Sequence, residues 1–120
     1  MAHVLLVEDE KNQRLLYQQE LLEEGYEVDV AKDGREALGM LKKNRPDVIV
    51  LDICMPGMDG IETLGQVLSR DNTIPVILHT AYSSYKDNFM TWSADAYVVK
   101  SSDLAELKAK LKEVLTKQRS

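Results

Sequence analysis

Cysteine is nearly absent from this chain of 120 residues, and the single one, Cys54, has no partner for an internal disulfide. One thiol also cannot build a thiolate metal site alone, so the composition favours a reducing compartment. Long hydrophobic runs are missing too, since none approaches the roughly 20 residues that a membrane-spanning helix needs. Met1 leads straight into an expected strand, without the pattern of a signal peptide. We therefore expect a cytoplasmic protein.

Basic residues are in deficit, because 15 lysines and arginines stand against 20 aspartates and glutamates, for a formal net charge of −5. A negative chain lacks the attraction that nucleic acids and anionic membranes exert on basic proteins. We thus expect no direct nucleic-acid binding and no membrane association. With 44% hydrophobic and 29% charged residues, the composition indicates one folded domain over residues 1–120.

Five apolar runs have the length of β-strands. The runs around residues 4–7, 48–51 and 76–78 are continuous, which is typical of strands covered on both faces of a parallel sheet. The run at 27–31 alternates and therefore suits an edge strand with one wetter face. The expected strands are 3–7, 27–31, 47–51, 74–79 and 96–99.

Patterns with helical periodicity lie between these runs. The first covers residues 11–24 and is followed by Gly25, where a C-terminal cap is expected. Asp33 with Glu36, and Asp103 with Glu106, are capping pairs that open two further helices. The leucines expected to face the core from the first helix are Leu15, Leu16, Leu21 and Leu22.

Two more helical patterns complete the alternation. Ile61, Leu64 and Leu68 form one apolar face, and Tyr85 and Trp92 with the intervening Phe89 predict a short helix within residues 82–95. Strands that alternate with helices predict a doubly wound α/β fold, because parallel strands need crossover helices.

Polar side chains follow four of the apolar runs. Glu8 and Asp9 come after the first, Asp52 after the third, Thr80 after the fourth and Lys100 after the fifth. The carboxyl ends of parallel strands share one edge of the sheet, where open α/β sheets bind ligands. We therefore expect these carboxylates, the hydroxyl and the ammonium to converge.

Such a group favours phosphoryl chemistry. Clustered carboxylates repel one another unless a hard divalent cation relieves them, and Mg²⁺ is the usual cation for such oxygen ligands. A cation, a lysine and a hydroxyl together suit a phosphoryl group. No glycine-rich phosphate loop follows the first strand. Asp52 is then the candidate nucleophile that would form an aspartyl phosphate.

The ordered set of these residues resembles the receiver domain of two-component response regulators, the CheY-like superfamily. The resemblance covers the whole chain and implies a flavodoxin-like, five-stranded parallel sheet of order 2-1-3-4-5. The residues that carry it are Glu8-Asp9, Asp52, Met55-Pro56-Gly57-Met58-Asp59-Gly60, Thr80-Ala81 and Ala94-Asp95-Ala96-Tyr97-Val98-Val99-Lys100.

The resemblance implies a role for each candidate residue. Asp52 would be the phosphoacceptor, and Thr80 and Lys100 would hold phosphate oxygens. Tyr97 would move inward behind Thr80 after phosphorylation, so that these two residues form the switch. The ligands of Mg²⁺ would be Glu8, Asp9, Asp52 and the backbone carbonyl of Cys54.

By the same resemblance the chain is a signalling module and not an enzyme. Its phosphate donor would be a sensor histidine kinase or a histidine phosphotransfer protein, and its target an output protein or domain. A degenerate receiver that binds partners without phosphorylation is an alternative. A dehalogenase-type phosphatase is a weaker one, because Cys54 stands where that family has a second acid. A flavodoxin-like cofactor carrier is disfavoured by the acidic first loop.

The chain departs from the family after the lysine, where Ser101 replaces the usual proline. The lysine–proline bond of the family is commonly cis, but a cis bond before serine costs roughly 2.5 to 4 kcal/mol. We therefore predict a trans bond between Lys100 and Ser101. A changed loop path would then place Lys100 farther from Asp52, or leave it more mobile, than the family implies.

Overall fold

A parallel sheet of five strands forms the centre of the computed structural model, which describes residues 2–53, 60–81 and 93–119. Its strand order is β2-β1-β3-β4-β5, which confirms the predicted topology. The alternating run lies at the edge, as predicted. The strands are β1 (His3–Val7), β2 (Glu27–Ala31), β3 (Val48–Leu51), β4 (Val76–Thr80) and β5 (Ala96–Val99).

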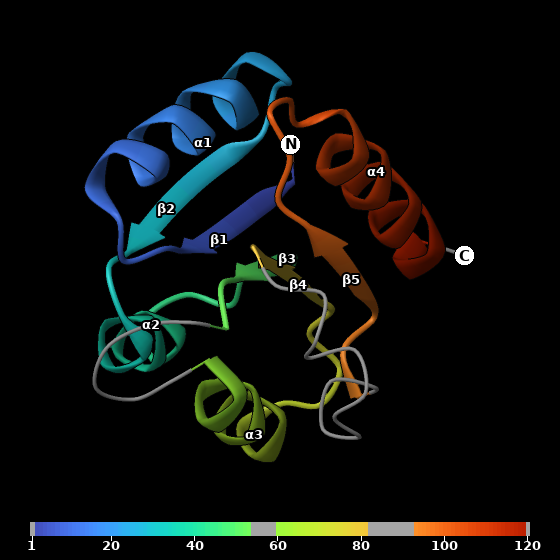
Figure 1. Ribbon diagram of the computed structural model, residues 1–120. Coiled ribbons are helices and arrows are strands. Elements are labelled where there is room, and N and C mark those ends of the chain that lie inside the picture. The colour runs from blue at the N-terminus through green and yellow to red at the C-terminus, as the bar shows by residue number, and fades with distance from the viewer. Residues whose placement is uncertain (1, 54–59, 82–92, 120) are drawn as a thin grey trace.

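Helices cover both faces of this sheet, so the doubly wound α/β prediction is confirmed (Figure 1). The helices are α1 (Lys11–Glu23), α2 (Gly34–Leu41), α3 (Gly60–Arg70) and α4 (Ala105–Arg119). The helix predicted around Tyr85, Phe89 and Trp92 lies outside the described residues. Among the helices that the structure describes, none combines the length and apolar character needed to traverse a bilayer.

The sheet separates two apolar cores. Side chains of one strand point alternately to opposite faces, so Leu5 packs toward α2 and α3 while Leu6 packs toward α1 and α4. Leu64 of α3 fills the first core, and Leu111 of α4 fills the second. This arrangement explains the continuous apolar runs, since a strand between two layers of helices must be apolar on both sides.

The predicted inner face of α1 is wrong for three of its four leucines and right for Leu21. Leu15, Leu16 and Leu22 are 53%, 55% and 50% exposed, whereas Tyr17 and Leu21 are buried against the sheet. Residues four apart share one face of a helix, and the buried pair has that spacing. The leucines were the most numerous apolar residues of α1, but most of them lie on its outer side.

The predicted caps at the start of α2 and at the end of α1 are confirmed. Asp33 accepts a hydrogen bond from the backbone N–H of Glu36 at 2.9 Å, and the Glu36 carboxylate accepts one from the N–H of Lys32 at 3.1 Å. Gly25 follows α1 with a φ of 94°, a left-handed conformation that favours glycine. These caps set where α1 ends and α2 begins, and with them the positions of the loops at the sheet edges.

Gly60, the first residue of α3, lies against the backbone that follows β3. Its N–H donates to the carbonyl of Ile53 at 2.7 Å. A Cβ at this position would lie 2.3 Å from both the carbonyl oxygen of Asp52 and the Cα of Ile53. Only a residue without a side chain allows α3 to approach the strand end so closely.

We predict that Gly60→Ala destabilises the fold by about 1 to 3 kcal/mol or more, because backbone atoms must move to admit the methyl group. Gly39→Ala in α2 is the matched control, since a Cβ there meets nothing within 4 Å. It should leave stability unchanged or raise it by up to about 1 kcal/mol through helix propensity. Urea unfolding measures both, and equal stability of the two variants would contradict the close approach.

Candidate functional site

The candidate site lies at the carboxyl edge of the sheet, where backbone hydrogen bonds continue past the strand ends. The N–H of Asp52 donates to the carbonyl of Val7 at 3.1 Å, which ties the end of β3 to that of β1. The N–H of Lys100 donates to the carbonyl of Thr80 at 2.7 Å, which ties the end of β5 to that of β4. The polar residues after the strands are therefore held by the sheet itself.

Three carboxylates meet at this edge. One oxygen from each of Glu8, Asp9 and Asp52 lies within 4.8 Å of the others. Glu8 is 2% exposed and Asp52 is 5% exposed, so water screens their repulsion poorly. An all-oxygen donor set of this charge and size suits a hard divalent cation such as Mg²⁺.

The Lys100 ammonium inserts into the carboxylate cluster. Its Nζ lies 2.7 Å from Glu8 Oε1, 3.0 Å from Asp52 Oδ2 and 2.7 Å from Gln13 Oε1. Burial by itself would lower the pKa of Lys100, but the bonds to the two carboxylates outweigh burial and raise that pKa. The ammonium therefore keeps its charge and neutralises part of the acidic cluster.

The pKa of Glu8 is also raised, but for a carboxyl group this shift disfavours the charged form. Burial is the main cause that raises the pKa of Glu8, and the charge of Asp52 adds to it. The hydrogen bond and the charge of Lys100 oppose this rise without cancelling it. Burial therefore disfavours the charged form of Glu8, and Lys100 offsets only part of this effect.

The prediction for the peptide bond after Lys100 is confirmed, because the described residues contain no cis bond. The expected displacement of Lys100 is wrong, since its Nζ lies within hydrogen-bond distance of Asp52. The loop instead enters α4 through Ser101, whose Oγ donates to the carbonyl of Asp103 at 2.7 Å. The length of the lysine side chain allows it to reach Asp52 without a cis bond.

The start of α1 belongs to the site, which the sequence pattern did not reveal. Glu10 caps the helix by accepting from the N–H groups of Asn12 and Gln13 at 3.1 and 2.8 Å. Arg14 Nη1 donates to the carbonyls of Glu8 and Asp9 at 3.0 and 3.2 Å. The loop with the two acidic residues is therefore clamped to the first turn of the helix.

Two buried rings lie behind the site. The Tyr17 ring centroid is 5.8 Å from Lys100 Nζ and 5.1 Å from the centroid of His79. Burial raises the pKa of Tyr17. Burial, and to a lesser extent the charge of Lys100, lowers the pKa of His79 to about 4. Both rings are therefore neutral near pH 7 and form an apolar wall beside the ammonium.

The remaining candidate residues differ in how much the structure says of them. Thr80 is fully buried at the end of β4, at the edge where Asp52 and Lys100 meet. Tyr97 lies on β5, paired in register with Leu78 and packed against the core under α2 and α3. Cys54, whose carbonyl was expected to bind the metal, lies outside the described residues.

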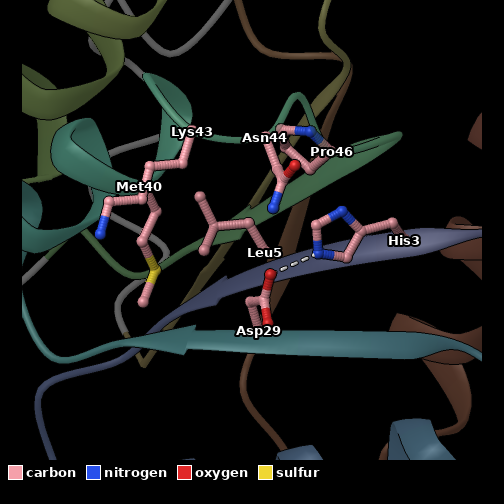
Figure 2. A pocket seen from close by; sticks show the side chains of 7 residues that line it. All are labelled: His3, Leu5, Asp29, Met40, Lys43, Asn44 and Pro46. Atoms are coloured by element: carbon pink, nitrogen blue, oxygen red, sulfur yellow. Dashed lines mark hydrogen bonds and ion pairs between the residues drawn. The ribbon is translucent and has the colours of Figure 1, made fainter.

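A cavity of about 190 Å³ lies between the sheet and the end of α2 (Figure 2). His3 and Asp29 line it from the start of β1 and the middle of β2, and Met40 and Lys43 line it from the helix side. A contact of 2.7 Å between His3 Nε2 and Asp29 Oδ2 joins the two strands there. None of the candidate site residues lines this cavity, so it is separate from the carboxylate cluster.

Known proteins with similar sequences and folds provide independent information. A family model described as the response regulator receiver domain matches residues 4–112. The transcriptional regulatory protein PcoR of Escherichia coli is 34% identical over 122 residues, which cover 100% of this chain and 54% of that protein. The chain spans about half the length of the curated relatives it matches.

Solved structures agree with this family match. The response regulator TrrA of Thermotoga maritima, in complex with Mg²⁺-BeF, is 45% identical with a TM-score of 0.92, covering 95% of this chain and 99% of that one. TrrA in complex with the histidine kinase ThkA is also 45% identical, with a TM-score of 0.90 and coverage of 96% and 99%.

We predict that the burial of His79 lowers the free energy of unfolding in acid. The unfolded chain takes up its histidine proton near pH 6.5, whereas the folded chain does so only at about 4. Between these values the unfolded state binds more protons, so stability falls as pH falls. From pH 7 to pH 5 the wild type should lose about 2 kcal/mol more than His79→Phe. Carboxylates titrate in both proteins and cancel in this difference, and parallel stability curves from urea unfolding would refute the prediction.

Proposed function

The chain belongs to the response regulator receiver domain family, and on that premise we propose that it accepts a phosphoryl group on Asp52. The donor is a sensor histidine kinase or a histidine phosphotransfer protein, and the chain acts as a cytoplasmic signalling module over residues 1–120. The observation that carries this proposal is the contact of Lys100 with Asp52 inside a cluster of carboxylates. The complex of ThkA with TrrA supports a histidine kinase as the partner.

Mg²⁺ is the cofactor that the donor set fits. Glu8, Asp9 and Asp52 would hold it through carboxylate oxygens, and the family resemblance adds the backbone carbonyl of Cys54 as a further ligand. When bound, the cation supplies positive charge beside the phosphoryl oxygens. The Mg²⁺-BeF complex of TrrA, a protein 45% identical to this chain, supports this assignment.

The chain's own side chains prepare Asp52 for attack. A carboxylate oxygen of Asp52 is the attacking nucleophile, and Lys100 Nζ lies 3.0 Å from Asp52 Oδ2, which holds the carboxylate in place. The Asp52 Oδ–phosphorus bond forms as the phosphorus–nitrogen bond to the donor's histidine breaks, and the electron pair stays with the imidazole. Lys100 and the Thr80 hydroxyl then hold oxygens of the transferred group.

Thr80 and Tyr97 would transmit the new charge to the protein surface. The two residues lie on the adjacent strands β4 and β5, and the backbone bond from Lys100 to Thr80 joins the ends of these strands. We propose that an inward movement of Tyr97 follows phosphorylation and alters the surface that binds an output protein or domain. The transcriptional regulator PcoR, about half of which this chain covers, makes an attached or separate output domain the expected target.

A phosphorylation-independent binding module is the second candidate. The observation in its favour is Ser101, which stands where the family usually has proline. Lys100 nevertheless reaches Asp52, so the loop does not prevent the chemistry.

Intact-mass measurement after incubation with a small phosphodonor tests the function. The wild type should gain one phosphoryl group with Mg²⁺ and none with a chelator, because the carboxylates alone repel the incoming anion. Asp52→Asn should gain none. Asp47→Asn, which alters an exposed aspartate just before β3, should behave as the wild type. Labelling of Asp52→Asn would contradict the assignment of the acceptor, and an unlabelled wild type that still binds its kinase would favour the binding module.

A further inference from the structure

Gln13 is the one uncharged partner of the Lys100 ammonium among the hydrogen bonds described for it. We infer that Gln13 is a positioning residue, which holds Lys100 beside Asp52 whatever the charge of the site. The inference rests on the proposed function, because it concerns the lysine that would bind the phosphoryl oxygens. A lysine ammonium has three N–H donors, and Glu8, Asp52 and Gln13 accept all three.

The geometry leaves one assignment of the Gln13 amide. An ammonium donates and never accepts, so the amide must present its oxygen to Lys100, at 2.7 Å. The backbone of Gln13 is itself fixed, since its N–H donates to the Glu10 carboxylate at 2.8 Å. Arg14, the next residue, binds the carbonyls of Glu8 and Asp9. The amide oxygen is therefore placed by the same turn of α1 that clamps the acidic loop.

A neutral acceptor can stay bonded to Lys100 when the two carboxylates bind other groups. Oxygens of Glu8 and Asp52 belong to the cluster that would bind Mg²⁺, so a cation competes with Lys100 for them. Phosphorylation would also convert one oxygen of Asp52 into the bridging oxygen of an acyl phosphate, a mixed anhydride. The Gln13 amide is neutral and is not one of the three carboxylates, so we expect its bond to Lys100 to persist through each of these changes.

The far end of Lys100 needs such a partner. Its backbone is held by the bond to Thr80, but four flexible methylene groups separate this anchor from the ammonium. The side chain is 12% exposed, so little water is available to replace a lost acceptor. Without Gln13 the ammonium would lose one of its three acceptors, and its position beside Asp52 would be less fixed.

Three variants of α1 test the inference. Gln13→Met keeps the length of the side chain and removes the acceptor, whereas Gln13→Glu keeps an acceptor oxygen. Gln19→Met is the matched control, because Gln19 is exposed on the same helix. Gln13→Ala provides a second deletion of the acceptor in case the methionine disturbs folding, and thermal unfolding verifies the fold of each variant.

The first readout is the ¹H–¹⁵N NMR signal of the Lys100 ammonium, recorded in the presence of Mg²⁺. This signal is visible only when hydrogen bonds slow the exchange of the ammonium protons with water. The signal should be present in the wild type, Gln13→Glu and Gln19→Met, and absent in Gln13→Met and Gln13→Ala. The second readout is the rate of phosphorylation by a small phosphodonor. Loss of one hydrogen bond should lower this rate about three- to tenfold in both acceptor deletions and leave Gln19→Met unchanged.

The two readouts separate failure of this inference from failure of the proposed function. A wild type that gains no phosphoryl group would refute the function, while the ammonium signal would still report on Gln13. An unchanged ammonium signal in both acceptor deletions would overturn the inference. So would a lost signal with an unchanged rate of phosphorylation, because the position of Lys100 would then not matter for the reaction.

Discussion

The contact of one buried ammonium with two buried carboxylates is the constraint on which the structure of the site depends. Glu8 and Asp52 are almost fully removed from water, and burying charges without partners costs several kcal/mol for each ion. Lys100 relieves them from a position 92 residues from Glu8 and 48 residues from Asp52 in the sequence. The ion pairs therefore form only when β1, β3 and β5 occupy their places in one sheet.

The sheet in turn connects the charge of the site to the β4–β5 edge. Lys100 extends from the end of β5 past β4 to side chains that follow β1 and β3. Its backbone is bonded to Thr80, at the end of the strand it crosses. A phosphoryl group on Asp52 would alter the partners of Lys100 and, through this contact, the β4–β5 edge. The proposed signal thus follows from the same contacts that stabilise the site.

The sequence predicted the sheet and the residues at its carboxyl edge because strand order and strand ends determine where those residues lie. It did not predict which side of α1 faces the sheet. Tyr17 and Gln13 lie on the inner face, whereas the exposed Leu15 suggested the opposite rotation. The periodicity of apolar residues does not determine which face of a helix is buried when apolar residues occur on opposite faces of that helix. The position of the Lys100 ammonium was not predicted either, because the sequence does not show how far a long side chain can compensate for a changed loop path.

A thermodynamic cycle between Lys100 and its acidic partners tests the central claim most directly. The free energy of unfolding is measured by urea denaturation without divalent cations, for Lys100→Met in the wild type and in the Glu8→Gln/Asp52→Asn background. If the ammonium neutralises the buried acids, Lys100→Met should cost about 3 to 5 kcal/mol in the wild type and little, or even stabilise, where the acids are gone. The same loss of stability in both backgrounds would contradict the account.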